Sequence, residues 1–334
     1  MRVGVIGAGS WGTALAKAAS EAGHQVTIWA YEADVADQIN QQHLNQRYLS
    51  GIELPPSLVA TNELAAVASG ADMLLSVTPS HVVRAIWEEL APHIDGDPYI
   101  VSASKGIENV TLATMLEVLR EVLPPRFDQR LSVLSGPSFA QEVAQRLPTA
   151  VVVASVELPT AQAVQQALST DRLRLYTSTD TAGVEIGGAA KNVIAIAAGI
   201  ADGLGFGTNT RAALITRGLA EITRLAVAKS ANPLTLAGLA GLGDLVLTCT
   251  GVMSRNRSVG LKLGEGQTLE QIQGAMSSVA EGIRSAKSCR GLARRLGVEM
   301  PIIDAIYSVL YDGVDARDAT QQLMQRQLRH ELEH

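Results

Sequence analysis

The stretch RVGVIGAGSWGTALAKAAS, residues 2–20, decides the fold of the first half of this 334-residue chain. A short β-branched run, Arg2–Ile6, leads into the pattern G-x-G-x-x-G at Gly7, Gly9 and Gly12, and a helical run follows. In this setting the first glycine permits a tight turn, the second lets the backbone approach a pyrophosphate, and the third allows the helix to pack closely on the strand. The N–H groups at the start of the helix then face the anion. The stretch therefore predicts a dinucleotide site, with a glycine turn that serves packing alone as the alternative.

The rest of the first half alternates strand-like and helix-like segments. The further β-branched runs are Gln25–Trp29, Met73–Val77, Tyr99–Ser102, Leu131–Leu134, Ala150–Val153 and Arg174–Tyr176. Helical spacing occurs between the runs at Trp11–Ala22, Val82–Leu90 and Leu112–Leu123. Such alternation is typical of parallel strands joined by crossover helices. It predicts an α/β domain of the Rossmann type, with a mostly parallel sheet, over residues 1–180.

From about Thr179 onward the β-rich runs stop and the pattern becomes helical. The expected helices are Ala182–Ala201, Thr210–Lys229, Leu269–Gln273, Gly282–Leu296, Ile302–Tyr311 and Ala316–Leu328. Pro301 suits the first turn of a helix and Asp315 suits an N-cap. The sequence therefore predicts an all-helical second domain over residues 181–330, with the boundary near 178–184.

Composition argues against several classes of protein. Hydrophobic residues make up 47% of the chain and charged residues 18%, which is typical of a globular protein of this length with about two domains. The net charge is −6 and no polybasic run occurs, so nucleic-acid binding is not expected. The six histidines lack metal-ligand spacing, and two cysteines, Cys249 and Cys289, are too few for a disulfide framework, so we expect neither a metal site nor disulfides.

Nothing near Met1 resembles a signal peptide, because the chain runs directly into the first strand. The longest apolar stretch, Val193–Ala201, is far shorter than the roughly 20 residues that span a bilayer. We therefore expect a soluble cytoplasmic protein without membrane insertion. Residues 332–334, Leu-Glu-His, are interpreted as the remnant of an affinity tag.

A lysine within a run of small residues is the first candidate for chemistry in the second half. In GGAAKN, residues 187–192, helical spacing places Lys191 on one face with glycines and alanines. Another helix, or a cofactor and substrate, can approach such a face closely. A partly buried amine can transfer protons, whereas an ordinary lysine is a solvated surface group.

A polar cluster follows further along the chain. In GLGDLVLTC, residues 241–249, Asp244 and Thr248 lie one helical turn apart. The segment SRNR, residues 254–257, is interpreted as a loop in which arginine captures a phosphate or carboxylate, with a solvated loop and helix cap as the alternative. Cys249 has no histidine nearby in sequence and is interpreted as a buried apolar cysteine rather than a nucleophile.

Two segments of the first half add polar groups at strand ends. Lys105 comes shortly after the run Tyr99–Ser102, and Ser138 comes shortly after Leu131–Leu134. Open α/β sheets bind ligands at the carboxyl ends of their strands. The alternatives are a surface charge for Lys105 and a helix N-cap, ahead of Phe139–Arg146, for Ser138.

Over residues 1 to about 329 the sequence resembles the bacterial NAD(P)-dependent sn-glycerol-3-phosphate dehydrogenases. The resemblance is carried by GAGSWGTALA at 7–16, SASKGIE at 102–108, SGPSFAQEV at 135–143, GGAAKNVIAIAAGIADGLGFGTNTRAALITRGLAE at 187–221, AGLGDLVLTCTGVMSRNRS at 240–258, VAEG at 279–282 and EMPI at 299–302. It implies reversible hydride transfer between a nicotinamide cofactor and dihydroxyacetone phosphate, giving sn-glycerol 3-phosphate for glycerophospholipid synthesis. It also implies a homodimer.

The resemblance implies roles for individual residues. Lys191 would exchange a proton with the substrate oxygen, with Lys105, Asp244 and Thr248 as its supporting polar network. The implied substrate contacts are Lys105, Gly136, Ser138, Lys191, Asp244, Ser254, Arg255 and Asn256. The implied cofactor contacts are Gly7, Gly9, Ser10, Trp11, Gly12, Tyr31, Lys105, Ala140, Arg255, Val279 and Glu281.

The sequence leaves the choice between NADH and NADPH open. Glu32 follows the second strand, near where an acid bonds the ribose 2′-hydroxyl of NAD and repels the 2′-phosphate of NADP. No arginine or lysine occurs between Trp29 and Asn45, which favours NADH, whereas similar family members commonly use NADPH. We therefore expect both NADH/NAD and NADPH/NADP to be used. A dehydrogenase of another hydroxy acid and a non-catalytic dinucleotide-binding sensor are the alternative functions.

Overall fold

A computed structural model describes residues 1–275, 280–327 and 330–331 of the chain. The chain divides into two compact units. The first comprises Met1–Lys105 and Ala113–Val184, and the second comprises Gly106–Leu112 and Glu185–His334.

The first unit is built on an eight-stranded sheet with the order β10-β9-β8-β7-β6-β1-β2-β5. Neighbouring strands are parallel except for the pair β8 and β9, so the expected mostly parallel sheet is confirmed. The strands are β1 (Arg2–Ile6), β2 (Gln25–Trp29), β5 (Val59–Thr61), β6 (Met73–Ser76), β7 (Tyr99–Ser102), β8 (Leu131–Ser135), β9 (Thr149–Ala154) and β10 (Leu173–Ser178). A separate antiparallel pair, β3 (Leu44–Asn45) and β4 (Leu49–Glu53), was not expected from the sequence, and neither was β5.

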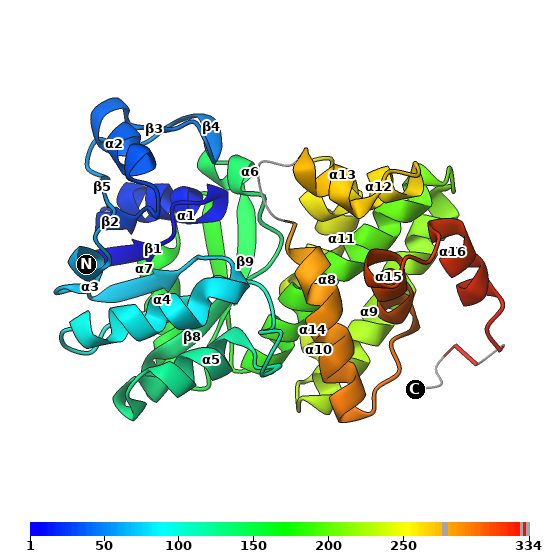
Figure 1. Ribbon diagram of the computed structural model, residues 1–334. Helices are drawn as coiled ribbons and strands as arrows, with labels where there is room; N and C mark the ends of the chain where they lie inside the picture. Colours follow the sequence, from blue (N-terminus) through cyan, green and yellow to red (C-terminus); the bar gives the residue numbers. More distant parts are fainter. Residues whose placement is uncertain (276–279, 328–329, 332–334) are drawn as a thin grey trace. The chain divides into compact units, whose positions relative to one another are not determined.

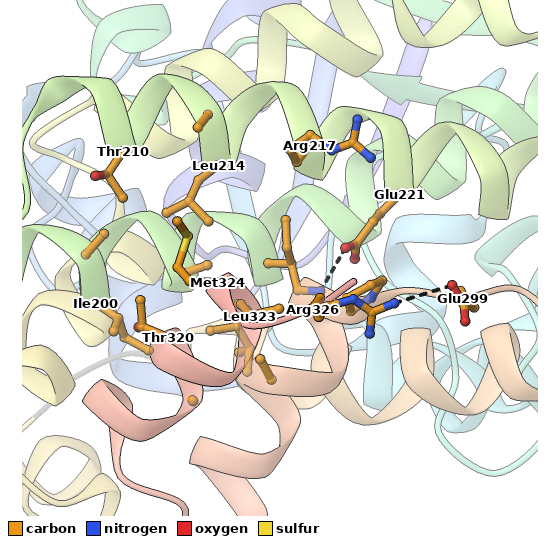
Figure 2. Close-up of a pocket in the computed structure, with 18 of the residues that line it drawn as sticks. Ile200, Thr210, Leu214, Arg217, Glu221, Glu299, Thr320, Leu323, Met324 and Arg326 are labelled. Carbon is orange, nitrogen blue, oxygen red and sulfur yellow. Dashed lines mark hydrogen bonds and ion pairs between the residues drawn. The ribbon is translucent and has the colours of Figure 1, made fainter. Parts of the chain in front are cut away.

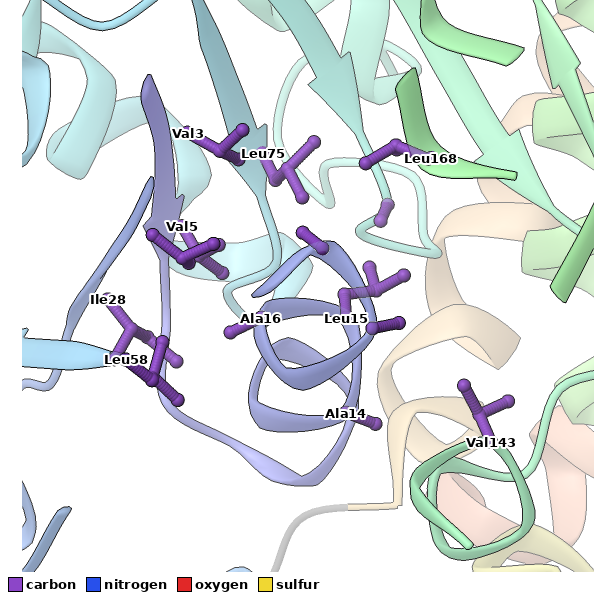
Figure 3. Packing of buried hydrophobic residues seen from close by; sticks show 14 of the residues in the cluster. Val3, Val5, Ala14, Leu15, Ala16, Ile28, Leu58, Leu75, Val143 and Leu168 are labelled. Carbon is purple, nitrogen blue, oxygen red and sulfur yellow. The ribbon is translucent and has the colours of Figure 1, made fainter. Parts of the chain in front are cut away.

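Helices cover both faces of this sheet (Figure 1). They are α1 (Ser10–Glu21), α2 (Ala33–Gln42), α3 (Leu64–Ala68), η1 (Ser80–Val82), α4 (Val83–Leu90), η2 (Ala91–His93), α5 (Met115–Val122), η3 (Pro125–Arg130), α6 (Ala140–Ala144) and α7 (Leu158–Leu168). Val5 of β1 and Leu15 of α1 belong to one buried apolar cluster (Figure 3), whereas Gly4 closely approaches Val67 of α3. Side chains that alternate along β1 therefore pack against helices on both faces of the sheet, as expected for a strand between two helical layers.

The order of the strands locates a ligand site. β1 lies between β2 and β6, and the connections leave β1 toward opposite edges of the sheet. In open α/β sheets a crevice forms at the carboxyl ends of the strands where the strand order reverses. The glycine turn after Ile6 stands at that point.

The second unit is helical in the described residues from Glu185 onward, in agreement with the sequence expectation, whereas its segment Gly106–Leu112 contains no helix. Its helices are α8 (Thr181–Gly203), α9 (Thr208–Ala228), α10 (Pro233–Leu236), the π-helical turn η4 (Leu239–Gly243), α11 (Asp244–Thr250), α12 (Arg255–Gly264), α13 (Leu269–Gly274), α14 (Glu281–Leu296), α15 (Pro301–Tyr311) and α16 (Ala316–Met324). Pro301 begins α15 and Asp315 caps α16 by accepting bonds from the N–H groups of Arg317 and Asp318, as predicted. The loop expected at 254–257 is wrong, because α12 begins at Arg255, whereas the helix cap of the alternative is confirmed, because Ser254 is the N-cap of α12.

Helix α8 forms the core of this unit and contacts α12 backbone to backbone. A Cβ added at Gly199 would lie 2.1 Å from the Arg257 carbonyl oxygen, and one at Gly260 would lie 2.0 Å from the Ile196 carbonyl oxygen. Only glycine permits so close an approach of two helices. By length and composition α8 could cross a membrane, but the apolar window of this helix is entirely buried, so it is a core helix.

Candidate active site

The glycine turn has the geometry that a dinucleotide requires. Gly7 adopts a φ of +118°, which favours glycine, and a Cβ at Gly12 would lie 1.8 Å from the Gly7 carbonyl oxygen. A Cβ at Gly9, in contrast, would meet no atom within 4 Å among the described residues. Packing therefore explains Gly7 and Gly12 but not Gly9. The open space at Gly9 is where a pyrophosphate would meet the backbone at the start of α1.

Two buried polar atoms beside this turn are unsatisfied. The Trp11 indole nitrogen and the Thr78 hydroxyl have no hydrogen-bond partner among the described residues. Buried polar groups without partners are rare in folded proteins and call for a ligand or water. The residues around the turn thus fit a bound nucleotide. Thr78 was missed in the sequence because it stands two residues beyond the strand Met73–Ser76, outside any recognisable motif.

Three further expected cofactor positions of the first unit are Ser10 at the start of α1, Tyr31 after β2 and Ala140 beyond β8. Ser10 donates its hydroxyl to the Tyr48 carbonyl oxygen at 2.5 Å, and Ala140 is the first residue of α6. Tyr31 is 80% exposed and its ring stands edge-on to Trp29 at 6.2 Å. The Tyr31 ring is therefore accessible to an adenine without any rearrangement of the core.

Lys105, Gly136 and Ser138 come together in the first unit. The Lys105 ammonium donates to the Gly136 carbonyl oxygen at 3.2 Å, and the Ser138 hydroxyl donates to the same oxygen at 3.1 Å. The alternative in which Ser138 caps a helix is wrong, since α6 begins at Ala140 with Phe139 at its N-cap. The arrangement gathers two polar side chains beyond the carboxyl ends of β7 and β8.

Lys191, Asp244 and Thr248 form a buried polar group in the second unit. The Lys191 Nζ donates to Asp244 Oδ1 at 2.5 Å and to Thr248 Oγ1 at 2.9 Å. Lys191 is 6% exposed and Asp244 1% exposed. Thr248 in turn donates to the Asp244 carbonyl oxygen at 2.6 Å, one turn back along α11. The alternative of a solvated surface lysine is therefore wrong.

The small residues beside Lys191 serve helix packing in part. A Cβ at Gly187 would lie 2.6 Å from the Ala240 carbonyl oxygen in η4. This close approach brings the start of α11, and with it Asp244, beside the middle of α8. Burying an ammonium costs several kcal/mol unless a charge partner and hydrogen bonds offset the loss of water. A pair held at this cost is a candidate for chemistry.

Cys249 follows this group in α11 but carries no reactivity of its own. Its side chain is fully buried, and burial raises the pKa of the Cys249 thiol to about 12, although the nearby Lys191 lowers it. A thiolate is the nucleophilic form of cysteine. The interpretation of Cys249 as a buried apolar residue is confirmed.

The start of α12 is tied to α8 and α14 through one asparagine. The Asn256 amide nitrogen donates to the Asn192 Oδ1 at 2.9 Å, and the Asn256 Oδ1 accepts from the Gly282 N–H at 2.9 Å. Arg255 beside it is exposed, and Ser254 is buried and accepts from the Arg257 N–H at 3.2 Å. Asn192 was not singled out in the sequence, although it directly follows Lys191.

A second tie at the same place is ionic. Asp202, at the end of α8, lies 2.7 Å from an Arg257 guanidinium nitrogen and 2.5 Å from an Arg211 guanidinium nitrogen. The Asp202 side chain is 7% exposed, so water screens these pairs little. Glu281, an expected cofactor contact, is the first residue of α14, whereas Val279 lies outside the described residues.

A cavity of about 890 Å³ lies among α8, α9, α15 and α16 (Figure 2). Among its described lining residues, none was expected to bind substrate or cofactor. Glu221 faces it and accepts hydrogen bonds from the N–H groups of Ile302 and Ile303, at 2.8 and 3.3 Å. Burial raises the pKa of the Glu221 carboxyl to about 7, and these two backbone bonds oppose the rise.

Comparisons with known proteins identify the family of the chain. Residues 2–161 and 180–321 match the family profiles described as the N-terminus and the C-terminus of NAD-dependent glycerol-3-phosphate dehydrogenase. The chain is 54% identical to a glycerol-3-phosphate dehydrogenase [NAD(P)+] of Citrifermentans bemidjiense, over 99% of this chain and 98% of the relative. It is 56% identical to one of Anaeromyxobacter dehalogenans, over 99% and 100%. The crystal structure of glycerol-3-phosphate dehydrogenase from Coxiella burnetii is 39% identical, with a TM-score of 0.92 over 97% of this chain and 99% of that one.

Proposed function

The chain belongs to the NAD-dependent glycerol-3-phosphate dehydrogenase family, and from that premise we propose how its residues catalyse the reaction. It is an NAD(P)-dependent oxidoreductase that interconverts dihydroxyacetone phosphate and sn-glycerol 3-phosphate. The single observation that supports the proposed mechanism is the buried contact of the Lys191 ammonium with Asp244 and Thr248.

Lys191 is the proton donor in the direction of ketone reduction. A nicotinamide dinucleotide whose pyrophosphate was held by the glycine turn would supply the hydride for C2 of the ketone. Negative charge then develops on the C2 oxygen, and the Lys191 ammonium stabilises this charge and transfers a proton to the oxygen. The amine regains its proton from solvent, and in the reverse direction it accepts the proton of the C2 hydroxyl.

Asp244 and Thr248 hold the ammonium in place. The Asp244 carboxylate, which is 1% exposed, keeps a counter-charge beside Lys191 where little water screens it. Thr248 both donates to the Asp244 backbone and accepts from Lys191, so it restricts the position of the Nζ atom. A fixed donor costs no reorganisation when the charge appears.

Arg255 grips the phosphate of the substrate at the start of α12. Its exposed guanidinium can form two charge-assisted bonds to a phosphate, and the positive end of a ten-residue helix adds to the attraction. Ser254 and Asn256 position this helix start, and Lys105, Gly136 and Ser138 complete the proposed substrate contacts. The phosphate is remote from C2, so its binding supplies orientation rather than chemistry.

Membership of the family suggests a location, an assembly and a metabolic role for the enzyme. We propose a soluble cytoplasmic homodimer that makes sn-glycerol 3-phosphate for phospholipid synthesis. Two free and buried cysteines support a reducing compartment. The apolar helix α8 is a buried core helix.

The test is NADH or NADPH oxidation, followed at the nicotinamide absorbance, with dihydroxyacetone phosphate added to wild type and Lys191→Met. We expect wild-type turnover, at least a hundredfold loss of kcat in the variant, and unchanged cofactor binding. Lys287→Met, an exposed lysine of α14, is the matched control and should keep full activity. A Lys191→Met enzyme that kept more than about a tenth of the wild-type kcat would refute the proton-transfer role.

A further inference from the structure

An acid, a phenol and a guanidinium meet at the carboxyl end of β2. The Tyr48 hydroxyl donates to Glu32 Oε1 at 2.6 Å, and an Arg47 guanidinium nitrogen lies 3.5 Å from the same oxygen. The Arg47 guanidinium also lies over the Tyr48 ring at 5.4 Å. Burial, followed by the bond to Glu32, raises the pKa of Tyr48, so the phenol stays protonated and donates.

This cluster is held in place by buried hydrogen bonds to the glycine turn. Arg47 and Tyr48 lie in the turn between β3 and β4. Asn45, the last residue of β3, is 1% exposed. The Asn45 amide donates to the Ala8 carbonyl oxygen and to Thr13, both at 2.8 Å. On the other side, Ser10 donates to the Tyr48 carbonyl oxygen. These bonds hold the backbone around Arg47 near the nucleotide turn, although Arg47 comes 15 residues after Glu32 in the sequence.

The position of this cluster has a known consequence in dinucleotide-binding folds. An acid after the second strand bonds the ribose 2′-hydroxyl of NAD, and an arginine there accommodates the 2′-phosphate of NADP. Here both groups are present, because the β3–β4 pair returns Arg47 to Glu32. The Arg47 side chain is 54% exposed, so an incoming phosphate can reach it, and its guanidinium lies between two carboxylates, Glu32 at 3.5 Å and Asp34 at 4.0 Å.

We propose that Arg47 is the residue that admits the 2′-phosphate of NADP, with Tyr48 and Glu32 positioning it, and that Glu32 serves NAD at the same place. The proposal rests on the dinucleotide role proposed above. Glu32 accepts from the 2′-hydroxyl when NAD binds. When NADP binds, the Arg47 guanidinium turns from Glu32 to the phosphate, while the Tyr48 hydroxyl stays on the carboxylate.

The test is equilibrium binding of adenosine 2′,5′-bisphosphate and of AMP to the full-length protein by titration calorimetry. These two probes differ only in the 2′-phosphate and require no turnover. Arg47→Gln should weaken the bisphosphate about ten- to a hundredfold, as loss of a charge-assisted bond does, and change AMP less than about twofold. Arg126→Gln is the matched control, because Arg126 is 55% exposed, lies over an aromatic ring and faces an aspartate elsewhere in the first unit. It should change neither affinity.

Three results would overturn the proposal. Equal weakening of both probes by Arg47→Gln would mean that Arg47 supports the fold of the β3–β4 pair rather than the phosphate. An unchanged bisphosphate affinity would exclude Arg47 as the selector. Failure of both probes to bind wild type would instead refute the dinucleotide role itself, together with everything that rests on it.

Discussion

Glu221→Gln should remove a pH-dependent part of the stability of the helical unit. Burial raises the pKa of Glu221 from 4.5 to about 7 in the folded chain. Between these two values the folded state holds a proton that the unfolded state has released, so stability falls as pH rises through this window and is level above it. A difference of about 2.5 pKa units at 1.36 kcal/mol each corresponds to about 3 kcal/mol.

Glutamine cannot titrate but keeps one carbonyl oxygen for the N–H groups at the start of α15. The lost second bond costs about 1 kcal/mol. Urea unfolding should therefore show that the free energy of unfolding falls by about 3 kcal/mol more in wild type than in the variant when the pH is raised from 4.5 to 8. Glu299→Gln is the control, because Glu299 lines the same cavity with its side chain 61% exposed, and it should follow wild type. Wild-type and Glu221→Gln stabilities that changed in parallel with pH would show that Glu221 is not the titrating group.

Three further substitutions test the site. Arg255→Ala should raise KM for dihydroxyacetone phosphate steeply but affect unphosphorylated dihydroxyacetone much less, and equal losses for both ketones in steady-state assays would contradict a phosphate contact. Gly9→Ala should leave the melting temperature nearly unchanged and weaken NADH binding. Gly12→Ala should lower the melting temperature, because the added Cβ meets the Gly7 carbonyl oxygen. The reverse pattern would contradict the open space at Gly9. Thr248→Val should lower kcat about five- to tenfold by removing one partner of Lys191, and an unchanged single-turnover rate would count against its positioning role.

Most of the sheet could be predicted from local pattern. β1 and β2 begin and end where the sequence indicates, because buried parallel strands are short, contiguous and rich in β-branched residues between turn residues. β3 and β5 were not predicted because they have only two and three residues, too few to show the alternation of a strand. Helix α12 was not predicted because its sequence is polar and contains Gly260, which disfavours a helix. Its contact with α8 compensates for this low helix propensity.

The candidate site was predictable only where its residues are neighbours in sequence. Asp244 and Thr248 share a helix face by spacing alone, but their contact with Lys191 joins residues 53 positions apart. Resemblance to a family indicates that pairing, whereas the spacing of residues in the sequence does not. Arg47 illustrates the limit, since a search confined to the residues after Trp29 finds only the acid and misses the cation that the β3–β4 pair brings back.

The short segment Gly106–Leu112 gives the chain an unusual connectivity. It follows Lys105 and precedes α5, yet it belongs to the helical unit, where the Arg295 guanidinium donates to the Thr111 and Leu112 carbonyl oxygens at 2.8 and 3.3 Å. The polypeptide therefore passes from one unit to the other after Lys105, returns after Leu112 and passes again after Val184. A single cut cannot release either unit intact, so gene fusions or truncations that treat the two halves as separable modules would leave each missing a piece. Recombination between relatives is expected to succeed only when this seven-residue segment travels with the helices rather than with the sheet.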